Sequence, residues 1–230
     1  MIHLNNNFKN NQYRILTEQI NLTSSDLDTK STNEIVSIFS ESDKEPQIAV
    51  ENAIPEIIKA IDEITLKLKS NGRLFYIGTG TSGRLGVLDA SECPPTFCTD
   101  PDLVQGIIAG GTKSLTRSSE SLEDLPEISI ADLKDRNFSN RDVLIGITAS
   151  GRTPYVLSAL NYSKNIRALT ISISSVPESD STLVNDIDIR LITGPEILAG
   201  STRLKAGTAT KMALNIISTS VMIKLGKVYG

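Results

Sequence analysis

Six consecutive residues, Gly78-Thr79-Gly80-Thr81-Ser82-Gly83, combine three glycines with three hydroxyl groups. Glycines let the backbone turn tightly and approach a ligand closely, and the hydroxyls add hydrogen-bond donors. The apolar run Leu74 to Ile77 precedes them and is typical of a buried strand, while Arg84 to Ala90 looks like the opening of a helix. A strand, a hydroxyl-rich turn and a helix N-terminus together form an anion site, most simply for a phosphate.

The same glycines, Gly78, Gly80 and Gly83, also satisfy the dinucleotide pattern G-x-G-x-x-G. A dinucleotide site would carry an acidic residue about 20 residues further on, at a strand end, and the sequence has no clear candidate there. The hydroxyl groups favour a phosphate monoester instead. A tight strand-to-helix turn that binds no ligand is the remaining interpretation.

A second turn, Thr148-Ala149-Ser150-Gly151-Arg152-Thr153-Pro154, again joins an apolar run to a helix start through hydroxyls and a glycine. We therefore expect the two turns to share one phosphate pocket. The expected hydroxyl donors are Ser82, Thr148, Ser150 and Thr153. Ser and Thr are also routine helix caps, and the two roles are compatible because a capping turn is also an anion cradle.

Acid–base work in this chain falls to carboxylates, lysines, tyrosines or thiols, because its single histidine, His3, stands near the N-terminus. Carboxylate pairs are common tools for such work when histidine is absent. Glu92 precedes Pro94-Pro95, which fix the backbone, so we expect Glu92 near the rim of the pocket. A second acidic cluster contains Glu120, Glu123 and Asp124. For any one of these glutamates, a solvated surface position is the commoner alternative.

Arg203 and Lys205 stand in a third glycine- and hydroxyl-rich segment, Gly194 to Thr208, which opens a helix. Two cations at this spacing are suited to neutralising a ligand's carboxylate or phosphate. The alternative is a capped helix with surface charges.

The composition is that of an ordinary globular protein. The 230 residues are 39% hydrophobic and 22% charged, with a net charge of −4, so there is no general basic footprint for nucleic acid. No apolar run is long enough for a membrane span, and the polar N-terminus lacks a signal-peptide core, which makes the cytoplasm the default location. Cys93 and Cys98 are expected to be reduced thiols, with a metal pair as the rarer alternative.

Short apolar runs alternate with helical segments, which predicts an α/β fold with a parallel sheet covered on both faces. The expected strands are 74–77, 104–109, 143–148, 169–173 and 187–192. The expected helices after the first turn are 84–90, 113–124, 132–137, 154–164 and 205–224. In such sheets the ligand lies at the carboxyl ends of the strands, where both hydroxyl-rich turns fall.

The segment before the first strand is expected to be an N-terminal extension. Residues 1–30 are polar and predict an extended arm. Ser31 and Glu34 form a capping-box pattern that predicts the start of a short helix. Pro46 suits a first helical position. Isoleucines then recur at helical spacing up to a stop at Gly72, and Pro55 is expected to kink this helix or divide it in two.

Four blocks of the sequence carry a resemblance to a known family. They are Gly-Thr-Ser-Gly-Arg-Leu-Gly-Val-Leu-Asp-Ala-Ser-Glu-Cys-Pro-Pro-Thr from Gly80, Ile-Ile-Ala-Gly-Gly from Ile107, Ala-Ser-Gly-Arg-Thr-Pro-Tyr-Val from Ala149, and Gly-Ser-Thr-Arg-Leu-Lys-Ala-Gly-Thr-Ala from Gly200. Over Pro46 to Gly230 the chain closely resembles the N-acetylmuramic acid 6-phosphate etherases, which are built on the sugar-isomerase (SIS) domain. The block from Gly194 to Asn215 is also similar to the glucokinase regulatory protein, a non-enzymatic relative.

The resemblance implies removal of D-lactate from the 3-ether of N-acetylmuramic acid 6-phosphate, giving N-acetylglucosamine 6-phosphate, in peptidoglycan amino-sugar recycling. It implies a homodimer, a phosphorylated amino sugar as substrate, no cofactor and no metal. The family's two carboxylates map onto Glu92, as the acid that protonates the leaving oxygen, and onto Glu123, as its acid–base partner. The expected substrate- and phosphate-binding residues are Thr79, Thr81, Ser82, Arg84, Thr148, Ser150, Thr153, Arg203 and Lys205.

The resemblance also implies a three-layer α/β/α SIS sandwich over residues 46–230, with an N-terminal arm and short helix over residues 1–45. Two departures stand out. Cys98 replaces the family's usual glycine, so an altered turn is expected there, and family members continue beyond Gly230 through a helical portion that these 230 residues lack.

Two other functions remain open beside the etherase. A non-catalytic SIS phosphosugar sensor would need the hydroxyl turns but no carboxylate pair, so Glu92 and Glu123 favour the enzyme. An aldose–ketose phosphosugar isomerase is less favoured, because its proton shuttle commonly uses a histidine or an added domain.

Overall fold

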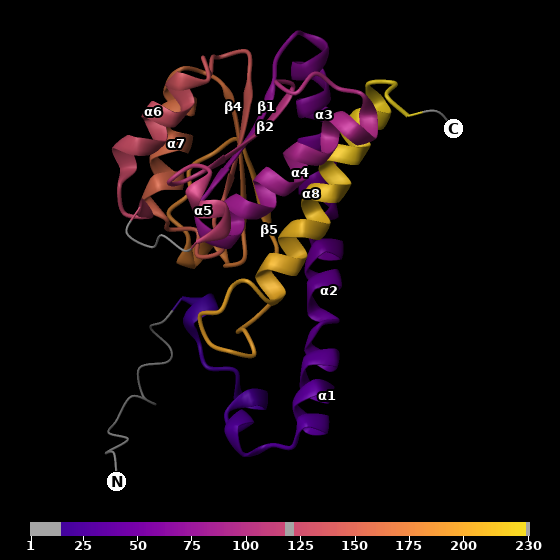
Figure 1. The fold of residues 1–230 in the computed structure, drawn as a ribbon, viewed down its shortest axis with the longest axis vertical. Coiled ribbons are helices and arrows are strands. Elements are labelled where there is room, and N and C mark those ends of the chain that lie inside the picture. Colours follow the sequence, from indigo (N-terminus) through magenta and orange to yellow (C-terminus); the bar gives the residue numbers. More distant parts are fainter. Residues whose placement is uncertain (1–14, 118–121, 229–230) are drawn as a thin grey trace.

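The computed structural model describes residues 15–117 and 122–228 (Figure 1). Its centre is a parallel sheet of five strands in the order β2-β1-β3-β4-β5. The strands are β1 Leu74–Gly78, β2 Val104–Ile108, β3 Val143–Ile147, β4 Leu169–Ser174 and β5 Ile187–Arg190. All five expected strands are confirmed to within two residues at each end. The parallel α/β fold expected from the apolar runs is therefore confirmed.

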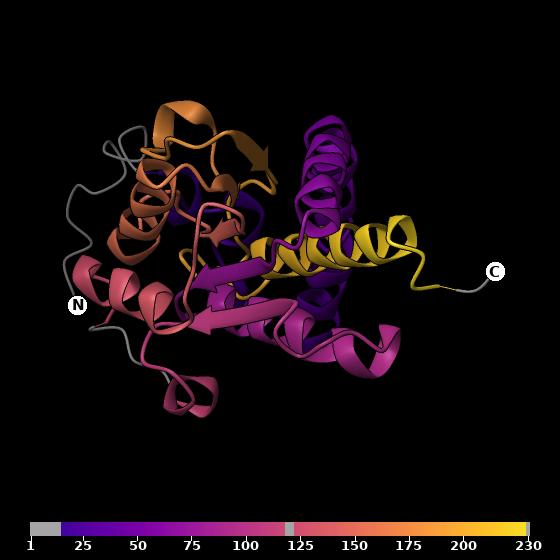
Figure 2. The same ribbon diagram turned by 90° about the horizontal axis from the view of Figure 1, so that it is seen from above.

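Helices cover both faces of the sheet because successive strand residues point to opposite faces. Leu74 and Tyr76 pack on one face with α2 Glu45–Asn52, α3 Ile54–Lys69, α4 Gly80–Phe97 and α8 Lys205–Lys224. Phe75 and Ile77 pack on the other face with α6 Pro126–Asp135 and α7 Pro154–Asn165. Figure 2 shows α3 and α8 on one side of the strands and α6 and α7 on the other.

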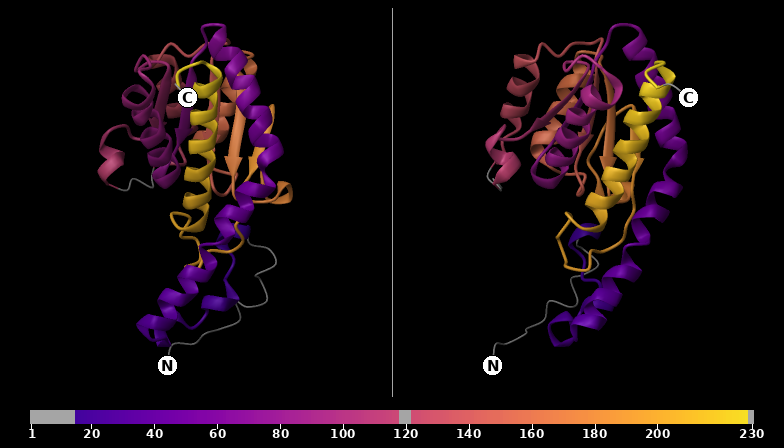
Figure 3. Two further views of the ribbon diagram at one scale, coloured as in Figure 1. Left: turned by 90° about the vertical axis from the view of Figure 1, so that its right-hand side faces the viewer. Right: turned by 45° about the vertical axis from the view of Figure 1, so that its right-hand side comes forward.

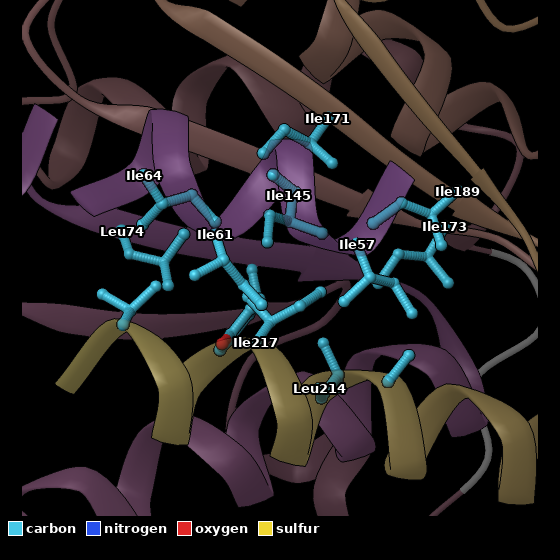
Figure 4. Packing of buried hydrophobic residues seen from close by; sticks show 14 of the residues in the cluster. Ile57, Ile61, Ile64, Leu74, Ile145, Ile171, Ile173, Ile189, Leu214 and Ile217 are labelled. Carbon is cyan, nitrogen blue, oxygen red and sulfur yellow. The ribbon is translucent and has the colours of Figure 1, made fainter. Parts of the chain in front are cut away.

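The larger core lies between the sheet and the pair formed by α3 and α8. Figure 4 shows Ile57, Ile61 and Ile64 of α3 meeting Leu214 and Ile217 of α8 over strand residues. The isoleucine spacing in α3 places these side chains on one face. Pro55 lies in the first turn of α3, and α2 ends at Asn52, so the expected helix is divided in two rather than kinked.

The N-terminal extension differs from the expected arm over its described part. Residues 15–30 form three short 3-10 turns, Leu16–Glu18, Leu22–Ser24 and Leu27–Thr29, so the expectation of an extended arm was wrong there. The helix α1, Thr32–Ser42, begins with the predicted capping box, in which the Ser31 amide donates to Glu34 Oε2 at 2.8 Å. Residues 1–14, including His3, lie outside the described residues.

Three helix predictions were wrong in extent. The helix expected over 132–137 begins six residues earlier, as α6, Pro126–Asp135. The helix α4 begins at Gly80 and continues through Pro94 and Pro95, which lie in its last turn and remove two hydrogen-bond donors without ending it earlier. It ends at Cys98, whose left-handed backbone (φ 51°) closes the helix where a glycine is usual. The expected helix over 113–124 forms only as α5, Lys113–Thr116, within the residues described.

The strand order places a topological switch between β1 and β3. From β1 the chain moves outward to β2, and then returns to the other side of β1 to form β3. In such sheets the segments that follow the two strands diverge and leave a crevice at the carboxyl edge. Figure 3 shows the strand arrowheads pointing toward the end of the molecule where α8 begins. None of the helices in the described ranges is both long enough and apolar enough to cross a bilayer.

Candidate active site

A cavity of about 370 Å³ opens at this switch point. The first turn contributes Thr79, Gly80, Thr81, Ser82 and Arg84, and the second contributes Thr148, Ala149, Ser150 and Thr153. The remaining lining residues are Thr17, Glu18, Glu123, Gly200 and Thr202. The structure therefore brings the two hydroxyl-rich turns together around one space, as their position after neighbouring strands predicts. Most of its lining surface is polar, which suits a hydrophilic ligand.

The first turn leaves the N-terminus of α4 open to the cavity. Gly80 adopts a left-handed backbone (φ 49°) that starts the helix directly after Thr79. A Cβ on Gly83 would lie 2.6 Å from the carbonyl oxygen of Gly78, so glycine is required for this close approach of α4 to β1. The Thr79 side chain does not cap the helix. The first-turn amides and the positive end of the helix dipole are thus available to an anion.

The second turn contributes a linked group of hydroxyls to the cavity. Thr148 Oγ1 lies 2.9 Å from Thr153 Oγ1 and 3.5 Å from Ser150 Oγ. Gly151 supplies the left-handed residue (φ 67°) between them. At the start of α7, Pro154 has no N–H, and the Tyr155 amide donates to the backbone carbonyl of Glu123 at 3.1 Å. The second turn therefore presents a linked set of hydroxyls to a ligand.

Glu123 joins the two turns. Its Oε1 accepts a hydrogen bond from Thr79 Oγ1 at 2.6 Å, and its carbonyl accepts one from the amide of Tyr155, directly after the second turn. The side chain is half-buried and lines the cavity. Thr79 thus orients a carboxylate, a role that the phosphate-binding assignment did not anticipate. Glu123 is in a position to exchange protons with a bound ligand.

Arg84 is the cation among the described residues that line the cavity. Its Nε donates to the Leu115 carbonyl at 3.1 Å and its Nη2 to the Arg117 carbonyl at 3.2 Å. These bonds tie α4 to the segment that leads toward Glu123. Arg84 therefore holds the wall of the cavity and contributes positive charge to it.

Glu92 does not reach this cavity within one chain. It is exposed on α4 and lines a separate cavity of about 170 Å³, together with Asp89 and Lys211. Ten residues of helix separate it from Ser82, which is about 15 Å along the axis. The expectation that Glu92 lies near the pocket rim was therefore wrong for a single chain. The helix α4 is continuous from Gly80 through Glu92, and it carries Glu92 away from the turn.

Arg203 and Lys205 do not line the cavity either. Arg203 is exposed, and the Lys205 side chain is only 1% exposed because its Nζ pairs with Glu45 beside a different cavity. The N-terminus of α8 is already occupied by Glu196, which accepts from the amides of Lys205 and Ala206 at 3.0 Å each. Burial raises the pKa of the Glu196 carboxyl, and the two amides act against that rise. The charges here stabilise the fold around α8.

Hydrogen bonds of the partly buried Asp89 join α4 to β1 and to α8. Asp89 accepts hydrogen bonds from Tyr76 Oη on β1 at 2.8 Å and from Ser218 Oγ on α8 at 3.0 Å. Burial raises the pKa of the Asp89 carboxyl and raises the pKa of the Cys93 thiol to about 12. Cys93 is buried and Cys98 is exposed, and both are free thiols. The helix that carries the open N-terminus is therefore held firmly against β1 and α8.

Sequence reasoning missed Thr17 and Glu18, which line the cavity from the N-terminal extension. No periodicity or motif in the polar segment around them distinguishes these residues. Gly200 and Thr202 belong to the segment that contains Arg203 and Lys205. The small residues of this segment line the cavity, and its two cations do not.

Sequence identity to curated relatives shows the family to which this chain belongs. The chain is 85% identical over all 230 residues to the "N-acetylmuramic acid 6-phosphate etherase" of Prochlorococcus marinus (strain NATL2A), and spans 74% of that protein. It is 58% identical over 216 residues to the etherase of Parasynechococcus marenigrum (strain WH8102), covering 94% of this chain and 68% of that one. The chain belongs to the N-acetylmuramic acid 6-phosphate etherase family.

The other comparisons place this etherase-family chain among SIS domains. Residues 56–164 match the model described as the glucokinase regulatory protein N-terminal SIS domain. Phosphoheptose isomerase GmhA from Neisseria gonorrhoeae superposes with a TM-score of 0.61 at 16% identity, over 84% of this chain and 98% of that one. A phosphoheptose isomerase from Francisella tularensis gives a TM-score of 0.56 at 19% identity, over 83% of this chain and 100% of that one. At this identity the likeness concerns the fold, and the expected SIS-type sandwich is confirmed.

Proposed function

We propose that this protein cleaves the D-lactyl ether of N-acetylmuramic acid 6-phosphate with one water, giving N-acetylglucosamine 6-phosphate and D-lactate. The observation that carries this proposal is the cavity at the switch point, where an open helix N-terminus, a set of hydroxyls and the Glu123 carboxylate face one space. Membership of the etherase family supplies the reaction. Peptidoglycan amino-sugar recycling is the context in which such a substrate arises.

The 6-phosphate binds at the start of α4. The first-turn amides lack a side-chain cap and carry the positive end of the helix dipole, so they attract a dianion. The hydroxyls of Thr148, Ser150 and Thr153 lie across the same cavity and can donate to the phosphate oxygens. Binding energy gained at the phosphate holds the sugar, so the reacting carbons are presented to acid–base groups in a fixed orientation.

The reaction proceeds by elimination followed by hydration. The sugar ring opens to an aldehyde, which makes the proton on C2 acidic. A carboxylate removes that proton, the C3–O bond breaks, and the leaving oxygen takes a proton to become the hydroxyl of D-lactate. Water then adds at C3 and a proton returns to C2, so the atoms of substrate and water are all accounted for. Glu123, oriented by Thr79 inside the cavity, is the carboxylate placed for proton transfer at C2.

The acid that protonates the leaving oxygen is assigned to Glu92 of a second copy of the chain. In one chain Glu92 lies about 15 Å of helix away from the phosphate site, whereas C2 and C3 are only a few bonds from the phosphate. A homodimer that brings α4 of one copy to the cavity of the other would supply this group. The homodimer and the cytoplasmic location remain predictions.

The test of the reaction measures D-lactate release from N-acetylmuramic acid 6-phosphate by the purified protein. Glu123→Gln should lower the rate by at least about a hundredfold, while binding of N-acetylglucosamine 6-phosphate, read from its thermal shift, stays. Glu127→Gln, an exposed carboxylate in the first turn of α6, is the matched control and should keep full activity. A thermal shift without lactate in the wild type would identify a phosphosugar sensor instead.

The assignment of Glu92 is tested by mixing two inactive variants. If the site uses Glu123 of one copy and Glu92 of the other, then Glu92→Gln and Glu123→Gln chains that exchange subunits will form one intact site per mixed dimer and regain lactate release. No recovery, with mixed dimers shown by native mass spectrometry, would place Glu92 and Glu123 in the same chain's site or remove Glu92 from the mechanism.

A further inference from the structure

The turn Leu16–Glu18 is built into the wall of the cavity. The Gly200 amide donates to the Thr17 carbonyl at 3.0 Å, and the Leu16 amide donates to Asp180 Oδ2 at 3.1 Å. Further along the same segment, Ser24 Oγ donates to the Ile197 carbonyl at 2.6 Å. These bonds join residues that are far apart in the sequence, so the segment is anchored to the loops that come after β4 and β5.

The Glu18 carboxylate lies against Gly200. A Cβ on Gly200 would lie 2.8 Å from Glu18 Oε2, and Gly200 has a left-handed backbone (φ 76°). A side chain at position 200 would therefore displace the Glu18 carboxylate from its present position. Beside Glu18, Thr17 is 2% exposed, and its Oγ1 is buried without a hydrogen-bond partner in the described structure. Both residues line the cavity.

We propose that Glu18 binds the substrate by accepting hydrogen bonds from the sugar hydroxyls that lie between the phosphate and the reacting carbons. Glu18 and Glu123 are the acidic residues among the described lining of this cavity. A carboxylate repels a phosphate dianion, which excludes the phosphate as its partner. Sugar hydroxyls donate strong charge-assisted bonds to a carboxylate, and the hydroxyls nearest the phosphate are those on C4 and, in the open chain, C5.

This role differs from those of the two catalytic carboxylates. Glu123 is held by Thr79 between the two turns, whereas Glu18 reaches the cavity from the N-terminal extension, beside Gly200. The inference rests on the proposed function for the identity of the sugar. It makes the N-terminal extension a part of the substrate site, and it makes Gly200 a positioning residue for Glu18.

The deciding experiment compares Glu18→Gln with the wild type and with Asp28→Asn, an exposed carboxylate on the same extension that lies outside the cavity. Titration with N-acetylglucosamine 6-phosphate should show affinity lowered about tenfold in Glu18→Gln and unchanged in Asp28→Asn. The KM for N-acetylmuramic acid 6-phosphate should rise by the same factor, with kcat nearly constant. Inorganic phosphate should bind all three proteins equally.

A second variant tests the position of the Glu18 carboxylate beside Gly200. Gly200→Ala should weaken N-acetylglucosamine 6-phosphate binding as Glu18→Gln does, and combining the two should add little, since both act on one carboxylate. Unchanged sugar-phosphate affinity in Glu18→Gln would overturn the inference. So would a fall in kcat at constant KM, which would indicate proton transfer instead. Absence of lactate release by the wild type would overturn the proposed function, and the N-acetylglucosamine 6-phosphate titration would still decide the role of Glu18.

Discussion

The two strand-to-helix turns around the cavity have similar sequences and different uses. After β1, the turn gives way at once to α4, whose first amides have no side-chain cap. After β3, Pro154 has no N–H and the Tyr155 amide donates to the Glu123 carbonyl, so the start of α7 offers fewer amides than the start of α4, and the hydroxyls of the turn line the cavity. A shared pattern of glycine and hydroxyls therefore does not fix which groups meet the ligand. The helix start that comes after each turn decides which groups are free to bind.

Glu123 depends on both turns at once. The first holds its carboxylate through Thr79, and the second holds its backbone through Tyr155. This arrangement couples the phosphate site to the proposed acid–base group. Substitutions in the two turns should therefore separate three effects, on folding, on phosphate binding and on catalysis.

The largest expected effect is on folding, at the glycine where the first turn meets β1. A Cβ added at Gly83 would lie 2.6 Å from the Gly78 carbonyl oxygen and 2.7 Å from Ile108 Cγ1. Because a strand carbonyl cannot move away, Gly83→Ala should destabilise the protein by about 3 kcal/mol, measured by urea unfolding.

The counterpart in the second turn is Gly151→Ala. There the added Cβ would meet the movable Ser181 Oγ at 2.8 Å, and the left-handed backbone (φ 67°) adds strain, so we expect a loss of about 1–2 kcal/mol. Equal losses at Gly83 and Gly151 would contradict the distinction between a backbone clash and a side-chain clash.

The next effect is on phosphosugar binding, where the hydroxyls of the second turn should matter more. Thr148→Val removes a buried hydroxyl that lies 2.9 Å from Thr153 Oγ1, and should lower the affinity for N-acetylglucosamine 6-phosphate about tenfold. Ser82→Ala leaves the α4 amides in place and should cost only about threefold. The thermal-shift titration measures both, and a larger loss in Ser82→Ala would reverse the assignment of the two turns.

An effect of the same size, on catalysis instead of binding, is expected when the hydrogen bond that orients Glu123 is removed. Thr79→Val removes the hydroxyl that donates to Glu123 Oε1 at 2.6 Å, and should lower kcat about tenfold with little change in N-acetylglucosamine 6-phosphate affinity. Thr79→Ser keeps the donor and should retain most of the wild-type kcat. If Thr79→Val instead weakens binding at constant kcat, Thr79 contacts the ligand directly.

The smallest expected effect lies at the far end of α4. Cys98→Gly relieves a left-handed backbone (φ 51°) on a non-glycine residue, and should stabilise the protein by about 1 kcal/mol. Because the N-terminus of α4 is untouched, affinity for N-acetylglucosamine 6-phosphate should not change. A change in that affinity would show that the two ends of α4 are coupled. The urea midpoint and the same ligand titration give both quantities.

Local patterns in the sequence were sufficient to predict most of the secondary structure and the two turns at the cavity. Apolar runs predict the five strands because parallel strands are buried on both faces, and the helix α8 runs from Lys205 to Lys224 as its composition predicts. The capping box at Ser31 and the two hydroxyl-rich turns are equally local features. Seven of the nine expected substrate- and phosphate-binding residues line the cavity for this reason, since each comes after a strand at the same edge of the sheet.

Tertiary structure alone decided which charged groups share that cavity. Glu92 is carried away because α4 is continuous from Gly80 through Glu92, and Lys205 is buried and paired with Glu45 instead of lining the cavity. Glu18 is brought in by hydrogen bonds to residues far along the chain. The sequence determined the strands and the two turns, because short-range backbone preferences and burial control these features. The position of a side chain across the cavity depends on helix length and long-range packing, which no local pattern encodes.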